Sequence, residues 1–336
     1  MAEMAIYTLK AGDVEMVVTN FGARVMKLFV PGKDGKKADI VLGYNTIEEY
    51  VDNKGERFLG AVCGRFANRI AKGSFELDGA TYTLPINNNG QTLHGGLKGV
   101  DMVAWDVVEV SDSKIVFKYV SVDGEEGFPG TLTTEMSYEL TPENEYVIKY
   151  TSTTDKATHV NFTHHSFFNL KGEGEGDING HILQINADGF IPIDNVSIPT
   201  GEIAAVEGNA FDFRTAKAIG TDLAAKETQL EMGAGYDHCW VLNGEGLKLA
   251  ATVVEPASGR KMEVYTDQPG IQFYGGNFFD GKTVSKGGDK TYDYRGSLAL
   301  ETQKFPDTPN QPQFPSTRLD VGETYTHTCI YKFSVE

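Results

Sequence analysis

The sequence is poor in cysteine and contains no long apolar run. Its 336 residues include only Cys63, Cys239 and Cys329, too few and too scattered for a disulfide framework or a thiolate metal site. We therefore expect buried free thiols in a reducing compartment. The start of the chain, MAEMAIYTLKAGD, lacks the positive residues and apolar stretch of a secretory signal, and no stretch approaches membrane-spanning length. These absences predict a cytoplasmic protein with no membrane partner.

Basic residues are scarce as well. Lys and Arg total 30 against 47 Asp and Glu, which gives a net charge of −17 and a pI near 4.9. Such a field repels phosphate backbones and anionic lipid. The composition therefore argues against nucleic acid and membrane surfaces as partners, whereas a neutral ligand would not feel the charge.

Metal-binding motifs are missing. The chain has seven histidines, but neither HExxH nor a Cys–Cys…His–His spacing occurs. His164 and His165 are adjacent, so on a strand they face opposite sides and cannot easily share one ion. We predict no metal; a site built from separated histidines is the less favoured alternative.

Helical periodicity is nearly absent, whereas strand signals recur along the chain. Alternation such as KIVFKY at residues 114–119 is typical of half-buried antiparallel strands. Asp78–Gly79 lies between apolar runs and predicts a tight hairpin. No repeat, linker or shift of composition marks a boundary. We predict one all-β domain over residues 1–336, a large antiparallel sandwich or barrel with a few short helices.

Two short helices are the most that the sequence predicts. Residues 46–53 (TIEEYVDN) begin with Thr46, and Glu49 three residues later completes a capping box. Residues 221–231 offer one further short helix. Gly-, Pro- and Asp-rich breaks between the other segments predict turns.

The stretch His159–Leu170, HVNFTHHSFFNL, is unusually rich in hydrogen-bonding groups. Read as a strand, it places four polar side chains on one face: His159, Asn161, Thr163 and His165. The opposite face is mostly apolar and carries His164. Such a polar row is either solvated surface or the floor of a small-molecule groove, and the stretch alone favours neither.

The other polar groups that could do chemistry are scattered. Glu301 ends the apolar run SLAL and precedes the Pro-rich loop FPDTPNQPQFP, a plausible catalytic position, with structural ion pairing as the rival explanation. His94 lies in a loop whose glycines let the backbone approach a ligand. Taken singly, His94 is more typical of solvated surface, Arg69 of a surface ion pair and Asp237 of a turn than of a binding site.

Together these segments resemble a known family. The set NRI, LHGG, THHSFFNL, YDHC, GIQFYGGNF and LETQKFPDTPN, in this order between about residues 64 and 310, is similar to the galactose mutarotase (aldose 1-epimerase) family. Each motif is weak by itself, but the ordered set is highly specific. The resemblance implies a large antiparallel β-sandwich with a sugar groove on one sheet, and no metal or organic cofactor.

The resemblance also implies residue roles. Glu301 of LETQKFPD would be the general base and His165 of THHSFFNL the general acid. Five further residues would hold the sugar hydroxyls: Asn68, Arg69, His94, Asp237 and Gln272. The chain departs from the family at His164, where Asn is usual. The strand phase favours His165 as the acid, because His164 shares the face of Phe162.

The implied activity is interconversion of the α and β anomers of a neutral hexose such as galactose or glucose by acid/base ring opening. With reference pKa values of about 4.3 for Glu and 6.5 for His, a Glu301 carboxylate and a His165 imidazolium would coexist between them. Asp237 would extend this window towards neutrality. One aromatic ring would stack on the sugar, with three candidates: Phe167, Phe273 and Phe278.

Two other functions remain as alternatives. An epimerase of hexose 6-phosphates would need a cationic pocket, and the sequence shows no Arg/Lys cluster that provides one. A non-catalytic carbohydrate-binding module would not need an acid–base pair, so the presence of both Glu301 and His165 argues against it. The expected partner is a small-molecule sugar, and the expected assembly is a monomer or a weak homodimer.

Overall fold

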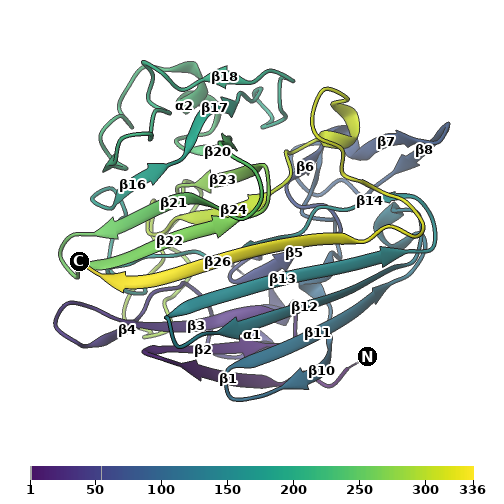
Figure 1. The fold of residues 1–336 in the computed structure, drawn as a ribbon. Coiled ribbons are helices and arrows are strands. Elements are labelled where there is room, and N and C mark those ends of the chain that lie inside the picture. The colour runs from purple at the N-terminus through teal and green to yellow at the C-terminus, as the bar shows by residue number, and fades with distance from the viewer. Residues whose placement is uncertain (1, 54) are drawn as a thin grey trace.

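Antiparallel sheets make up most of the structure (Figure 1). The computed structural model describes residues 2–53 and 55–336, and its named strands pair in antiparallel fashion. The largest sheet has nine strands in the order β10 (Asp106–Val110), β11 (Lys114–Ser121), β12 (Leu132–Leu140), β13 (Glu145–Thr154), β26 (Tyr325–Val335), β22 (Arg260–Thr266), β21 (Lys248–Glu255), β16 (Ile182–Ile185) and β19 (Lys217–Ala218).

Smaller sheets complete the architecture. A five-stranded sheet has the order β18 (Ala204–Ala205), β17 (Ala187–Ile191), β20 (Asp237–Leu242), β23 (Gly270–Tyr274) and β24 (Ala299–Gln303), and a four-stranded sheet joins β1 (Ile6–Ala11), β2 (Val14–Thr19), β3 (Arg24–Pro31) and β4 (Lys37–Asp39). Four two-stranded ladders pair β5 (Ala61–Cys63) with β15 (Thr163–His165), β6 (Arg69–Ile70) with β9 (Thr92–Leu93), β7 (Ser74–Leu77) with β8 (Ala80–Thr83), and β14 (Thr158–His159) with β25 (Arg318–Leu319). The predicted all-β class is confirmed.

Helices are few and short, as expected. Helix α1 (Ile47–Asp52) begins with the predicted capping box, in which the Glu49 N–H donates to Thr46 Oγ1 (3.4 Å) and the Thr46 N–H donates to Glu49 Oε2 (2.9 Å). Helix α2 (Thr228–Met232) is shorter than the predicted 221–231, because the preceding residues form turns.

The predicted hairpin at Asp78–Gly79 joins β7 and β8. Both turn residues have positive φ, 53° and 78°, which is the backbone that an Asp-Gly turn favours. The hairpin predicted from the Asp-Gly pair is therefore confirmed.

The core lies where the large sheets face one another. In β12 and β13, buried side chains alternate with more exposed ones, since successive strand residues point to opposite faces. The largest apolar cluster draws residues from both ends of the chain and from all three large sheets, for example Leu9, Met136, Ile271 and Phe333. Figure 1 shows the same arrangement, with the N-terminal strands beside the teal strands of the nine-stranded sheet.

The stretch 159–170 is not one continuous strand. It forms parts of β14 and β15 with a break between them, and every residue in it is buried. Buried polar groups need partners, and these are protein groups: His159 with Thr317, Asn161 with Lys304, and Thr163 with Thr302. Neither alternative for the polar row holds along its length, because the row is buried rather than solvated and only His165 of its four members lines the cavity described below.

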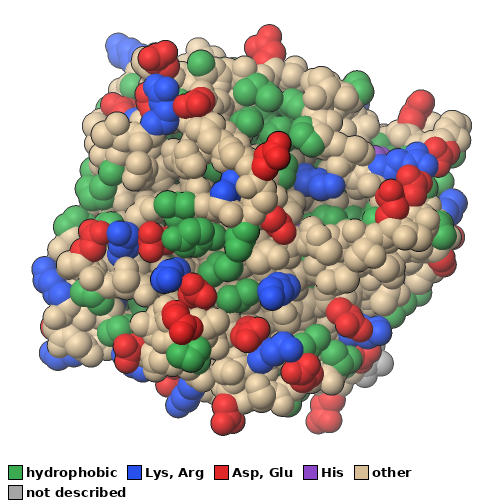
Figure 2. Space-filling model, in the orientation of Figure 1, with side chains coloured by type: hydrophobic (Ala, Val, Ile, Leu, Met, Phe, Trp, Pro, Cys, Tyr) green, Lys and Arg blue, Asp and Glu red, His purple; other side chains and the backbone are tan. Residues whose placement is uncertain are grey.

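The described residues contain no helix that is long and apolar enough to cross a membrane. Figure 2 shows acidic and basic side chains interspersed over the visible face. The three cysteines are buried and free, as expected from their scatter in the sequence.

Candidate active site

A cavity of about 260 Å³ brings the candidate residues together from distant parts of the chain. Six of the seven predicted site residues line it: Asn68, Arg69, His94, His165, Asp237 and Glu301. Strand β24 supplies Glu301, β20 supplies Asp237 and β15 supplies His165. The others come from β6 and from the turns around β6 and β9. Concave sites with a few converging polar groups are typical of small-molecule binding.

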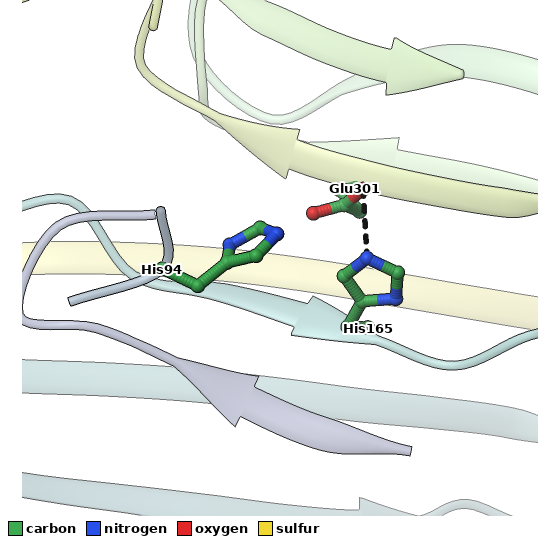
Figure 3. A group of neighbouring side chains, drawn as sticks. All are labelled: His94, His165 and Glu301. Atoms are coloured by element: carbon green, nitrogen blue, oxygen red, sulfur yellow. Dashed lines mark ion pairs between the residues drawn. The ribbon is translucent and has the colours of Figure 1, made fainter. Parts of the chain in front are cut away.

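Glu301 and His165 face each other in this cavity (Figure 3). Glu301 Oε1 lies 3.4 Å from His165 Nε2. Among the described residues, neither Glu301 Oε2 nor His165 Nδ1 has a hydrogen-bond partner, although both atoms are buried. A carboxyl group and an imidazole in this arrangement can pass a proton between themselves and offer their remaining atoms to a ligand.

The neighbouring His164 points into the core instead. Its Nδ1 lies 3.2 Å from the Tyr138 hydroxyl and its Nε2 lies 2.6 Å from Ser166 Oγ. Both of its nitrogens are therefore occupied by protein partners. The structure thus confirms the prediction that His164 and His165 face opposite sides of the strand.

Burial determines the charge state of the pair. It raises the pKa of Glu301 well above its usual range, with a further increase from Asp237 and a smaller decrease from Arg69. It lowers the pKa of His165 to about 3. The expected carboxylate–imidazolium pair is therefore wrong for the substrate-free cavity, because desolvation disfavours both charged forms. The favoured pair is a protonated Glu301 with a neutral His165. It has as many protons as the carboxylate–imidazolium pair, but one of them lies on Glu301 instead of on His165.

His94 and Asn68 fix each other's position. Both have positive φ, 50° and 63°, which is uncommon outside glycine and Asn. The Asn68 N–H donates to His94 Nδ1 (3.1 Å), and the His94 N–H donates to the Asn68 carbonyl (3.0 Å). Since Nδ1 of His94 accepts a hydrogen bond, its proton lies on Nε2. His94 therefore offers an N–H donor to a ligand oxygen.

His94, His165 and Glu301 also form a group that the sequence spacing could not show. One potential ligand atom of each lies within 4.8 Å of the others, and two imidazoles with one carboxylate can bind transition metals. The tautomer of His94 opposes this, because the protonated Nε2 has no lone pair for an ion. Coordination through Nε2 would break the hydrogen bond to Asn68.

We therefore expect dialysis against a chelator to leave the activity unchanged. The physical reason is that the acid/base transfer expected of Glu301 and His165 would use protons alone. The measurement is the initial rate before and after exhaustive dialysis, with a mock-dialysed sample as the control. A loss of activity that zinc specifically restores would contradict this expectation.

Asp237 lies beside two other predicted residues. Gln272 Nε2 donates to Asp237 Oδ1 (2.7 Å), and Gln272 itself is not among the lining residues. Burial raises the pKa of Asp237, while the positive charge of Arg69 opposes this increase. Arg69 is held in turn by Asn88, whose Oδ1 accepts from Arg69 Nε (3.2 Å). Asn88 lines the cavity and had no signal in the sequence beyond a polar loop, NNNG.

The aromatic wall differs in part from the expectation. Phe167 and Phe278 line the cavity, but Phe273 is completely buried in the main core, so its assignment is wrong. Phe273 follows Gln272 on β23 and therefore faces the other side of the sheet. Phe58 and Tyr274 also line the cavity and were missed. Phe58 precedes every motif on which the resemblance rests.

Comparisons with known proteins agree with this fold and show the family. The family described as aldose 1-epimerase matches residues 5–332. Galactose mutarotase of Bos taurus is 43% identical over 98% of this chain and 94% of its own length, and aldose 1-epimerase of Escherichia coli K12 is 40% identical over 96% and 93%. The crystal structure of a GalM/aldose epimerase homologue from C. elegans superposes with a TM-score of 0.91 at 29% identity, covering 99% of each chain. The chain belongs to the aldose 1-epimerase family, a class of isomerases.

Proposed function

We propose that this protein interconverts the α and β anomers of a neutral hexose such as galactose or glucose. The observation that carries the proposal is the Glu301–His165 contact of 3.4 Å, with one unpartnered polar atom on each residue, at a cavity that both residues line. The family membership and the names of the relatives support the same activity.

Anomer interconversion needs one proton to leave O1 while the ring oxygen gains one. In the proposed mechanism Glu301 accepts the O1 proton and His165 protonates the ring oxygen. Well-placed groups of this kind each contribute roughly 10²–10⁴-fold. After rotation about C1–C2, the same pair with its protons exchanged closes the ring. Nothing is oxidised and no group leaves.

Before this reaction, a proton must move from Glu301 to His165 in the substrate-free pair. Its single proton is favoured on Glu301, and transfer over the short contact to His165 Nε2 generates the carboxylate–imidazolium form. Each pKa unit of difference represents about 1.4 kcal/mol. We propose that sugar hydroxyls donating to Glu301 supply this energy. Asn68, Arg69, His94 and Asp237 would orient the remaining hydroxyls, and Gln272 would act through its hydrogen bond to Asp237.

The direct test is polarimetry of freshly dissolved α-galactose and α-glucose with the purified protein. The proposal expects the rotation to reach its equilibrium value much faster than in buffer alone, in proportion to protein concentration. Heat-inactivated protein is the control. A sugar that binds without any acceleration of mutarotation would instead support the carbohydrate-binding module.

We further predict that neutral hexoses are preferred to their 6-phosphates. Arg69 is the only Lys or Arg among the described residues that line the cavity. A neighbouring hollow of about 610 Å³ shares Glu56 and Phe278 with the cavity, and Lys282, the one Lys among the described residues that line it, is paired with Asp280. The net charge of −17 would therefore repel a phosphate with little cationic compensation from the described lining.

The measurement for this prediction is kcat/KM for galactose, glucose and glucose 6-phosphate at one ionic strength. We expect the phosphate ester to be the poorest of the three. Raising the salt concentration should narrow the difference, because salt screens the repulsion. A clear preference for the phosphate ester would contradict the prediction.

We also propose how the molecule is organised and where it works. Residues 1–336 would form one domain, a proposal supported by the core cluster that spans Leu9 to Phe333. We propose a monomer or a weak homodimer. Three buried free thiols support a reducing compartment such as the cytoplasm.

A further inference from the structure

We infer that Phe58 is a positioning residue that holds the imidazoles of His94 and His165 in their working orientation. This inference rests on the proposed acid/base function. The Phe58 ring lies 4.7 Å from the His94 ring at 60° and stacks on the His165 ring at 5.9 Å and 27°. On His165, Phe167 provides a second ring at 4.6 Å. The acid imidazole therefore packs against two phenyl rings.

Packing is needed here because hydrogen bonds do not fix His165. Its Nδ1 has no partner among the described residues, and its Nε2 contacts only Glu301, at 3.4 Å. A catalytic histidine is commonly oriented by a hydrogen bond from its second nitrogen. Without that bond the ring could turn about its χ2 angle. The stacked rings supply the missing constraint.

The backbone of Phe58 is itself rigidly held. Its N–H donates to Glu56 Oε1 (3.1 Å), and its carbonyl accepts from the Ala61 N–H (3.0 Å). The carbonyls on either side, of Arg57 and Leu59, both accept from Arg24 Nη1 (2.7 and 3.0 Å). A side chain that orients others must be fixed first, and Phe58 meets this condition.

The Phe58 ring also has a support of its own. The Arg57 guanidinium carbon lies 5.0 Å from the ring centroid. Arg57 is locked by two hydrogen bonds to Asp101 (2.7 and 2.9 Å), a carboxyl group that is completely buried. The chain of contacts thus runs from a buried ion pair through Arg57 and Phe58 to the two imidazoles.

The test is Phe58→Leu, which removes the ring but keeps an apolar side chain. We expect kcat to fall about 10- to 100-fold, the scale of a small misplacement of reacting groups, while KM changes by less than about threefold. At pH 7, where the protein is folded, the His165 ring proton resonances in an NMR spectrum should broaden or split, because the ring is free to turn about χ2. If Phe58→Leu does not fold, Phe58→Met, which fills a similar volume, replaces it.

Phe75→Leu is the matched control. Phe75 is a buried ring that contacts another histidine, His159, at 5.0 Å and 87°, outside the cavity. It should lose stability but keep the wild-type kcat and the wild-type His165 resonances. Wild-type kcat and sharp, single His165 resonances in the Phe58 variant would overturn the inference. The NMR comparison at pH 7 needs no activity, so its outcome is separate from failure of the proposed function, which would appear as an inactive wild type.

Discussion

Replacing Glu301 with glutamine is expected to lower kcat by roughly 10²-fold or more, because it removes the group proposed to accept the O1 proton. The substitution suits this site particularly well. Since burial raises the pKa of Glu301, the wild-type side chain is protonated in the empty cavity, and an amide is close to it in shape and charge. The variant should therefore fold normally. Sugar binding should weaken far less than turnover.

Glu56→Gln provides a matched control for this variant. Glu56 is another cavity carboxyl whose pKa is raised by burial, but its Oε1 accepts from the Phe58 N–H and it has no imidazole partner among the described residues. We expect a far smaller loss of kcat. The double variant Glu301→Gln/His165→Asn should lose less than the product of the two single effects, because residues acting as a unit are not additive. Full activity of Glu301→Gln would require the mechanism to be abandoned.

Acidification is expected to unfold the protein well before ordinary carboxyl groups titrate. All seven histidines are buried, and burial is the main cause that lowers the pKa of each, to about 3 for His164, His165 and His238, to about 4 for His159, His181 and His327, and well below 6.5 for His94. Unfolded imidazoles bind protons near pH 6.5. Between these values the unfolded chain holds more protons, so the free energy of unfolding falls as the pH falls.

Buried carboxyl groups act in the opposite direction. The pKa values of five carboxyl groups are raised by burial, namely Asp39, Glu56, Asp237, Glu301 and Asp307. As the pH falls, these carboxyl groups take up protons in the folded state before they do so in the unfolded chain. They therefore stabilise the folded state on acidification. Nearly all seven imidazoles of the unfolded chain are protonated at pH 5, whereas at most five carboxyl groups of the folded chain compensate. Unfolding therefore takes up protons as the pH falls from about 6 to 5, and the free energy of unfolding falls with it.

The measurement is urea unfolding at pH 7, 6 and 5, followed by the fluorescence of Trp105 and Trp240, both fully buried. The urea midpoint should fall steeply with pH. His159→Gln, which removes one imidazole outside the cavity, should make the pH dependence shallower by about one proton. A midpoint that stays constant or rises towards pH 5 would show that burial of the imidazoles does not control stability.

The sequence predicted local features better than distant neighbours. Alternation identified the strands of the nine-stranded sheet, and the chemistry of Thr46 with Glu49 and of Asp78–Gly79 identified a helix start and a hairpin. These signals lie within a few residues of the structure they specify. The break within the stretch 159–170 depends instead on which distant segments pack against it. The alternation of side chains along the stretch carries no information about those segments.

The candidate site shows the same division. The ordered motifs identified six residues that line one cavity, but no motif includes Phe58. Of the three candidates for the stacking ring, Phe273 conflicts with Gln272 as a sugar-binding residue, because the two are adjacent on a strand and cannot both face the sugar. The sequence could not predict that the proton of the pair lies on Glu301. It depends on how completely the surrounding structure excludes water from the pair.

We propose that His165, which faces Glu301, exchanges protons with the sugar. The adjacent histidine, His164, provides the most direct test of this role. The measurement compares the mutarotation rates of α-galactose with His165→Asn and His164→Asn by polarimetry, at a temperature where both variants are folded. His165→Asn should lower kcat by roughly 10²-fold or more. His164→Asn should retain most turnover and lose only stability, since His164 bonds to Tyr138 and Ser166 in the core. Loss of turnover in His164→Asn together with normal turnover in His165→Asn would contradict the account.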